Sequence, residues 1–141
     1  MKHTDVVYIG IDLHSNTSTI GYMNHQGEYC GHYRVQTTSR NLINQVTGIP
    51  GKVKKLTLEQ SNLAFWAGEL LQQVVDELIV CDPRHNALIW RGENKNDRLD
   101  TLALCQLLRL GQLREVWRPK QMGLRRLFFH QVKEYHRLVK T

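Results

Sequence analysis

The strongest constraint on the fold is a run of β-branched and other apolar residues near the start of the chain, VVYIGIDL at residues 6–13, with an acid, Asp12, next to its end. Nearly continuous apolar runs of this length are typical of strands buried in the centre of a sheet. Residues 17–23 predict a second strand, residues 24–27 a turn, and residues 28–37 a third strand. The chain is therefore predicted to begin as a meander of antiparallel hairpins.

Helices and strands are then predicted to alternate. The predicted elements are a short helix from Ser39, its N-cap, to about Thr47, a strand over 52–59, a helix over about 62–76, a short strand ended by Pro83, a helix over 97–110 stopped by Gly111, and a last helix opened by Pro119. Three strands in a row followed by this alternation predict an α/β fold: a mixed five-stranded sheet with helices on its faces, plus a C-terminal helix.

Size and composition favour one globular domain. The chain has 141 residues, of which 41% are hydrophobic and 23% charged. No apolar run reaches about 18 residues, so we expect neither a transmembrane helix nor a membrane partner. Three widely separated cysteines, Cys30, Cys81 and Cys105, argue against a disulfide framework or a structural zinc site, and they are consistent with a location in the reducing cytoplasm.

The charge is distributed unevenly along the chain. Residues 1–83 hold six Lys and Arg against eight Asp and Glu, whereas residues 84–141 hold thirteen against five, so the balances are −2 and +8. This asymmetry is expected of a chain that combines an acidic site with a surface for a polyanion. A solvated basic helix face would give the same count, and the count does not choose between the two.

Four acids form the candidate site. Asp12 and Glu59 each lie at the end of an apolar strand, while Asp97 and Asp100 are three residues apart on a predicted helix and so share a face. Four converging carboxylates would repel one another, and Mg²⁺ or Mn²⁺ would relieve the repulsion because these ions prefer oxygen ligands. The alternative for each acid is an ordinary surface role: Asp97 near a helix N-terminus, for example, or Asp100 paired with a neighbouring base.

Three stretches carry a resemblance to a known family: YIGIDLHSNTSTIGYMNHQGE at residues 8–28, TLEQSNLAFW at 57–66, and VCDPRHNALIWRGENKNDRLDTLALCQLLRLGQL at 80–113. In this order they resemble the N-terminal domain of the DEDD transposases of insertion sequences, relatives of the Piv DNA invertase that include the bridge-RNA-guided recombinases. The resemblance covers roughly residues 7–118. Its most specific parts are GIDLH and the NKNDRLD block with the leucine-rich helix after it.

The resemblance implies a ribonuclease-H-like (RuvC-like) domain over residues 1–118, with Asp12, Glu59, Asp97 and Asp100 as catalytic residues that coordinate Mg²⁺. It also implies DNA and a guide RNA as partners. Residues 119–141 resemble the start of a coiled-coil linker, through which a homo-oligomer is expected to form. The second domain of the family, which carries a serine nucleophile, is not in this sequence, so we expect transposase and recombinase chemistry to be incomplete in this chain alone.

Two positions depart from the family pattern. Thr101 stands where an alanine commonly follows the last acid, and Gln60-Ser61-Asn62 replace the usual small residues after Glu59. Neither change removes one of the four acids, so the expectation of a metal site is kept.

Basic residues in the second half of the chain are the candidates for nucleic-acid binding. They are Arg91, Lys95, Arg118, Lys120, Arg125 and Arg126. The histidines are expected to be structural or solvated because they fall on different predicted elements. His14 is the exception, since it lies two residues after Asp12 and could touch a phosphate.

Two other functions compete with a transposase domain. The first is a truncated, non-catalytic module that binds RNA or DNA without cutting it. The second is an ATPase of the actin-like or sugar-kinase class, because GIDLHSNTSTIGY also resembles the phosphate loop of that fold. No Gly or Thr follows Asp12 at the usual close spacing, and 141 residues cannot form two lobes around a nucleotide, so the ATPase is disfavoured.

Overall fold

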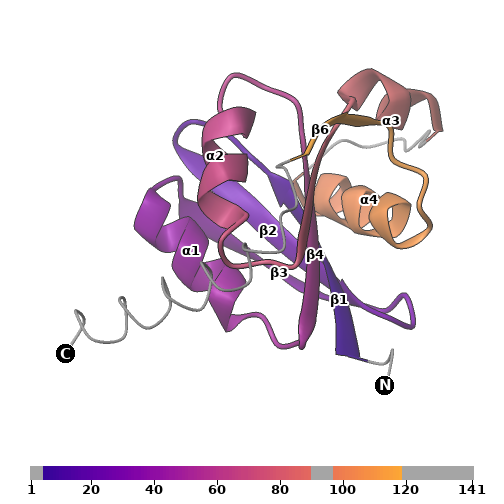
Figure 1. The fold of residues 1–141 in the computed structure, drawn as a ribbon, viewed down its shortest axis with the longest axis horizontal. Helices are drawn as coiled ribbons and strands as arrows, with labels where there is room; N and C mark the ends of the chain where they lie inside the picture. Colours follow the sequence, from indigo (N-terminus) through magenta and orange to yellow (C-terminus); the bar gives the residue numbers. More distant parts are fainter. Residues whose placement is uncertain (1–4, 90–96, 119–141) are drawn as a thin grey trace.

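The computed structural model describes residues 5–89 and 97–118, and for residues 97–100 it describes the backbone alone. The described elements are, in chain order, β1 (Val6–Asp12), β2 (Thr17–Asn24), β3 (Tyr29–Gln36), α1 (Ser39–Gly48), β4 (Val53–Glu59), α2 (Ala64–Leu71), β5 (Glu77–Cys81), α3 (Pro83–Ile89), α4 (Asp97–Arg109) and β6 (Glu115–Trp117). Figure 1 shows their arrangement. None of the described helices is long and apolar enough to cross a membrane.

The strands form one mixed sheet in the order β3-β2-β1-β4-β5-β6. Strands β1, β2 and β3 are antiparallel neighbours, as the meander predicted, whereas β4 lies parallel to β1 and β5 parallel to β4. The predicted fold class, an α/β fold with a mixed sheet and helices on its faces, is confirmed. The predicted number of five strands is wrong by one.

The missed strand is β6, which pairs antiparallel with β5 and places Trp117 opposite Val80. Three residues are too few to show an alternating pattern, so this strand has no local signature in the sequence. Its position is supported instead by tertiary packing, because the Trp117 ring meets the Phe65 ring edge-on at 5.3 Å between centroids.

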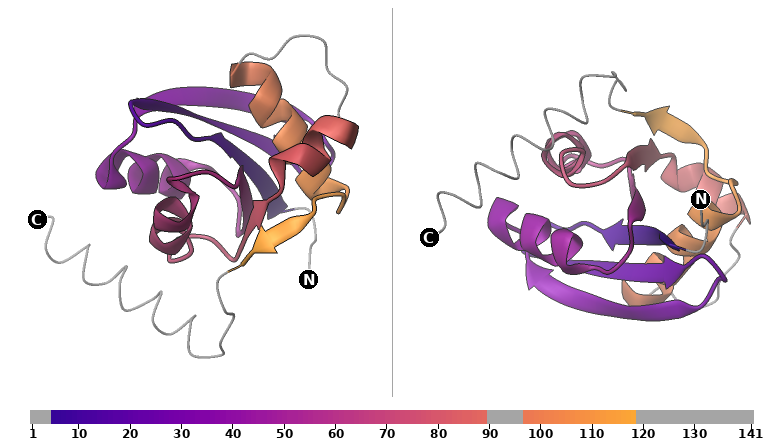
Figure 2. Two further views of the ribbon diagram at one scale, coloured as in Figure 1. Left: turned by 90° about the horizontal axis from the view of Figure 1, so that it is seen from above. Right: turned by 60° about the horizontal axis from the view of Figure 1, so that its bottom comes forward.

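One face of the sheet is covered by α1 and α2, and the other by α4 (Figure 2). Ile9 and Ile11 of β1 and Leu56 and Leu58 of β4 belong to the buried core beneath α1 and α2. Because side chains alternate along a strand, the residues between them face the α4 side. Gly10, Asp12, Thr57 and Glu59 therefore share one face of the sheet.

Helix α4 packs closely on β1 and β2 because glycines lie beneath it. A Cβ atom on Gly10 would come within 3.0 Å of the Thr101 carbonyl oxygen, and one on Gly21 within 2.7 Å of Thr101 Oγ1. These two glycines are opposite each other in the β1–β2 register. The absence of both side chains lets the helix backbone approach the sheet.

The helix over 97–110 agrees with prediction, and Gly111 ends it as expected with a φ of +69°. Two other helix predictions need correction. The N-cap of α1 is Thr38 rather than Ser39, since the Thr38 hydroxyl accepts a hydrogen bond from Asn41 N at 3.1 Å. Helix α2 ends at Leu71 instead of reaching residue 76, because Asp76 leaves the helix to exchange backbone and side-chain hydrogen bonds with Lys54 on β4.

Helix α3 was not predicted. It covers seven residues after Asp82, whose carboxylate accepts a hydrogen bond from Arg84 N at 2.9 Å and so caps the turn. The predicted C-terminal helix from Pro119 lies outside the described residues.

Candidate functional site

Asp12 and Glu59 lie side by side at the carboxyl edge of the sheet. Strands β1 and β4 are parallel neighbours, and their register pairs Ile11 with Leu58 immediately before the two acids. Neighbouring strands are ~4.8 Å apart, and both acids face the α4 side, so the two carboxylates project from adjacent strands on the same face. They are mostly but not completely buried; the Asp12 side chain keeps 16% of its surface exposed.

Asp12 is paired with His14, the histidine that the sequence analysis singled out because it lies two residues after this acid. His14 Nε2 lies 3.1 Å from Asp12 Oδ1, and the imidazole itself is 62% exposed. The loop after β1 is held in place by two hydroxyl groups, because Thr37 Oγ1 donates to the His14 carbonyl at 2.6 Å and Ser18 Oγ bonds Thr37 Oγ1 at 2.6 Å. His14 is thus presented to solvent beside the first acid from a well-anchored loop.

Glu59 is held by a residue that the sequence analysis missed. Asn86 Nδ2 donates to Glu59 Oε2 at 2.8 Å, and the Asn86 side chain comes from α3, across the end of β5. Asn86 is 6% exposed, and its Oδ1 has no hydrogen-bond partner among the described residues. No motif marks this asparagine in the sequence, because its importance depends on a contact between residues 27 positions apart.

Cys81 lies below the contact between Asn86 and Glu59. Its thiol accepts weak hydrogen bonds from Thr57 Oγ1 at 3.3 Å and from Asn86 Nδ2 at 3.4 Å. Burial raises the pKa of the Cys81 thiol above its usual range, so the sulfur stays protonated at neutral pH. As a buried, protonated thiol, Cys81 packs beneath Asn86 and is not activated as a nucleophile.

The direction of α4 brings Asp97 and Asp100 toward the same edge. Thr101 and Leu104 lie over Gly10 in the middle of β1, whereas Arg109, at the far end of α4, lies beside Gly27, near the start of β1. The helix therefore runs antiparallel to β1, and its first turn is directed toward the end of β1 that carries Asp12. The side chains of these two acids lie outside what the structure describes.

The hydroxyl group of Thr101, at the position where the transposases that the sequence resembles commonly have an alanine, forms a buried hydrogen bond. Its side chain is fully buried, and Thr101 Oγ1 lies 2.6 Å from the hydroxyl of Tyr29 on β3. An alanine at this position could not form that bond. The contact ties the first turns of α4 to the third strand of the sheet.

Among the described side chains no group of three or more His, Cys, Asp and Glu is arranged to hold a metal ion. This statement covers Asp12 and Glu59 but not Asp97 or Asp100. The described part of the site thus consists of two neighbouring carboxylates, one buried amide and one exposed imidazole.

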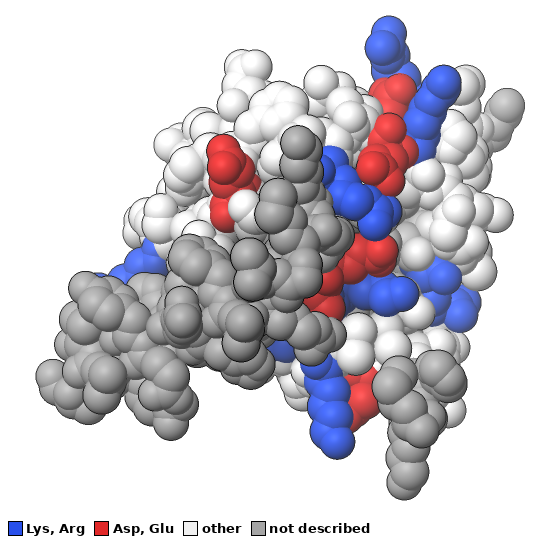
Figure 3. Space-filling model, viewed as in Figure 1, with Lys and Arg blue, Asp and Glu red and all other residues white. Residues whose placement is uncertain are grey.

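Of the six predicted nucleic-acid-binding residues, the structure describes only Arg118. Its guanidinium pairs with Glu77 at 3.2 Å and with Glu115 at 3.0 Å. Arg91, Lys95, Lys120, Arg125 and Arg126 lie outside the described residues. On the face seen in Figure 3, described Lys and Arg side chains alternate with Asp and Glu instead of forming one basic patch.

No family model and no curated protein matches the chain. Among solved structures, the chain is similar to that of T. thermophilus RuvC in complex with a Holliday junction substrate, with 12% sequence identity and a TM-score of 0.49. The similarity covers 78% of this chain and 99% of the RuvC chain. At this level nothing about activity or partners is transferred from RuvC to this chain.

Proposed function

We propose that this chain is the metal-binding domain of a DNA transposase or recombinase of the DEDD type, in which Asp12, Glu59, Asp97 and Asp100 together bind Mg²⁺ or Mn²⁺. One observation carries the proposal: Asp12 and Glu59 end adjacent parallel strands on the face of the sheet that α4 covers, and α4 begins, with Asp97 and Asp100, toward that same end. In this proposal residues 1–118 form a ribonuclease-H-like domain and residues 119–141 begin a helical linker that joins copies of the chain.

The chemistry of the donors fits a hard divalent cation. Asp12 and Glu59 offer carboxylate oxygens, the ligands that such ions prefer, from mostly buried positions on neighbouring strands. The buried Oδ1 of Asn86, without a partner among the described residues, is a further oxygen at the same place.

A bound Mg²⁺ would supply charge stabilisation for phosphodiester chemistry, by activating an oxygen nucleophile and stabilising the leaving oxygen. The chain itself holds the two carboxylates at neighbouring strand ends and presents His14 from the anchored loop beside Asp12, where it can contact a phosphate oxygen.

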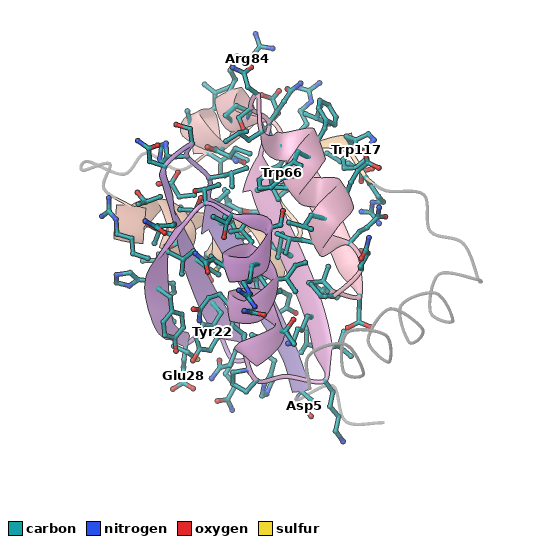
Figure 4. All side chains as sticks on the ribbon, turned by 90° about the vertical axis from the view of Figure 1, so that its left-hand side faces the viewer. Asp5, Tyr22, Glu28, Trp66, Arg84 and Trp117 are labelled. Carbon is teal, nitrogen blue, oxygen red and sulfur yellow. The ribbon has the colours of Figure 1, made fainter. Side chains whose placement is uncertain are left out.

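We predict that Mg²⁺ stabilises the protein and that Asp12→Asn abolishes the effect. A ligand that binds only the folded state raises the melting temperature, and loss of one charged ligand weakens binding of the ion. The measurement is the melting temperature in EDTA and at increasing Mg²⁺. Asp5→Asn is the matched control, since Asp5 lies at the opposite end of the molecule from Arg84 and α3 (Figure 4). An equal response of the wild type and the Asp12→Asn variant would contradict the metal site.

For the partners, we propose DNA and a guide RNA, both bound in the cytoplasm. The residues proposed to bind them are Arg91, Lys95, Arg118, Lys120, Arg125 and Arg126.

We predict that the double variant Arg125→Gln, Arg126→Gln binds a DNA duplex more weakly than the wild type. The slope of the logarithm of its affinity against the logarithm of the salt concentration should also fall by the amount expected for about two lost phosphate contacts. Gel shifts at rising salt measure both. Binding that persists in a wild-type protein with no Mg²⁺ response would favour the non-catalytic RNA- or DNA-binding module, and unchanged binding by the double variant would exclude these arginines.

A further inference from the structure

The buried amide of Asn86 is the least explained polar group beside the carboxylates. Asn86 is 6% exposed and lies on α3, and its Nδ2 donates to Glu59 at the end of β4. We propose that Asn86 is a positioning residue for Glu59 and that its Oδ1 provides a neutral oxygen to the same cation. This inference rests on the proposed metal site and assigns it a fifth contributor.

The orientation of the amide follows from its neighbour. An ionised carboxylate oxygen such as Glu59 Oε2 only accepts hydrogen bonds, so the Asn86 amide must direct its Nδ2 donor toward it. The 2.8 Å contact between Nδ2 and Oε2 agrees with this orientation. A flipped amide would bring Oδ1 against the carboxylate, and two acceptors would face each other. With Nδ2 committed to Glu59 and, more weakly, to Cys81 Sγ at 3.4 Å, the Oδ1 atom is left as the acceptor for something else.

The backbone around Asn86 fixes this position. Asn86 N donates to the Asp82 carbonyl at 3.2 Å, and Asp82 N donates in turn to the Arg114 carbonyl at 2.9 Å. The residue is therefore anchored directly after β5, where the chain leaves the sheet at the edge that carries Glu59. With its backbone fixed in this way, Asn86 can use its side-chain amide to orient the Glu59 carboxylate toward a shared ion.

The Oδ1 atom of Asn86, which has no hydrogen-bond partner within residues 5–89 and 97–118, is the observation that separates this role from simple packing. A buried acceptor without a hydrogen bond is destabilising, and such groups are rare in folded proteins. An asparagine that merely linked α3 to β4 would need only its Nδ2. A hard cation bound by Glu59 would give the Oδ1 atom its missing partner, since amide oxygens are common ligands of such ions.

The test compares Mg²⁺ titrations of the melting temperature for the wild type, Asn86→Leu and Asn86→Asp, each starting in EDTA. Asn86→Leu keeps the approximate shape and removes both polar atoms. We expect it to raise the Mg²⁺ concentration at half-maximal stabilisation roughly 10- to 100-fold or more, because it removes the partner that orients Glu59 and also the proposed oxygen donor. Asn41→Leu is the control, because Asn41 makes a comparable amide contact, to the Gln36 carbonyl at 3.1 Å, on α1; its midpoint should not change.

Asn86→Asp keeps the inference testable if the leucine variant does not fold. In EDTA its new carboxylate faces Glu59, so we expect a lower melting temperature than the wild type, and a larger rise on adding Mg²⁺ because the ion relieves this repulsion. If both variants lower the melting temperature equally with and without Mg²⁺ and keep the wild-type midpoint, Asn86 is structural and the inference is overturned. A wild type with no Mg²⁺ response would instead overturn the metal site itself.

Discussion

At the scale of single residues, Asp12 and Glu59 occupy equivalent strand ends but have different surroundings. Asp12 meets the exposed imidazole of His14, whereas Glu59 meets the buried amide of Asn86. One carboxylate is therefore adjacent to solvent and the other is fixed from the protein interior. In the proposed metal site, Glu59 would be the ligand held from the interior, and the exposed His14 would lie on the side of Asp12.

The buried thiol of Cys105 is expected to lower the free energy of unfolding at alkaline pH. Burial raises the pKa of Cys105 to about 12, from an ordinary value near 9.0. Between pH 9 and pH 12 the Cys105 thiol has lost its proton in the unfolded chain but keeps it in the folded protein. The contribution of Cys105 to the free energy of unfolding is therefore complete below about pH 9 and disappears as the pH approaches 12. The slope expected from one proton is about 1.4 kcal/mol per pH unit.

We predict that Cys105→Ala flattens the fall in unfolding free energy between pH 9 and pH 11, measured by denaturant titration. Cys30→Ala is the comparison because the Cys30 thiol is exposed; its charge is only the smallest cause of the raised pKa of Cys105, so the slope should stay much closer to that of the wild type than in Cys105→Ala. Equal slopes for all three proteins would show that the buried thiol does not contribute to the alkaline loss of stability.

At the scale of elements, the contact between α4 and the β1–β2 pair decides where Asp97 and Asp100 lie. The helix sits directly on Gly10 and Gly21, and the bond between Thr101 and Tyr29 fixes it sideways. Any side chain beneath the helix would lift it from the sheet. The two glycines are thus positional requirements of the proposed site although neither touches a ligand.

We predict that Gly21→Ala destabilises the protein by about 1–3 kcal/mol, because the added methyl group would meet the Tyr29 hydroxyl and lie 2.7 Å from Thr101 Oγ1, and so would disturb the contact that ties α4 to the sheet. Denaturant unfolding measures the loss. Gly48→Ala at the end of α1 serves as the control, since an added Cβ there meets nothing within 4 Å and alanine favours a helix. If the two variants are equally stable, α4 does not pack on Gly21 as described.

The elements that could be predicted from the sequence are those with a local pattern. Strands β1 to β5 have apolar runs or alternation, and α4 has a long apolar stripe closed by Gly111. Helix α3 and strand β6 are too short to have such a pattern and depend on β5 for their place. The end of α2 was predicted too late because the competing bonds of Asp76 are made to β4, which periodicity cannot reveal.

At the scale of the whole molecule, the basic charge and the acidic site belong to different parts of the chain. The described residues hold ten Lys and Arg and eleven Asp and Glu, so the net charge of +6 comes from residues 1–4, 90–96 and 119–141. This agrees with the mixed charges on the face seen in Figure 3. The described residues are therefore nearly neutral, and five of the six residues proposed to bind nucleic acid lie outside them.

The candidate site shows how far sequence reasoning can go. That Asp12 and Glu59 end buried strands follows from their local runs, but that these strands are parallel neighbours follows from pairing across 47 residues of chain. The contact of Asn86 with Glu59 depends on the same long-range arrangement. Individual acids are therefore recognisable from the sequence, whereas the partners that orient them require the fold.

The convergence of the four acids on one ion is tested most directly by paramagnetic broadening of backbone amide signals with substoichiometric Mn²⁺. We predict that the amides of residues 12–14, 59–61 and 97–101 broaden together, while those of Gly27 and Arg109, at the other end of α4, stay sharp. Broadening at only one of the three segments, or spread over the surface without preference for them, would contradict a shared metal centre.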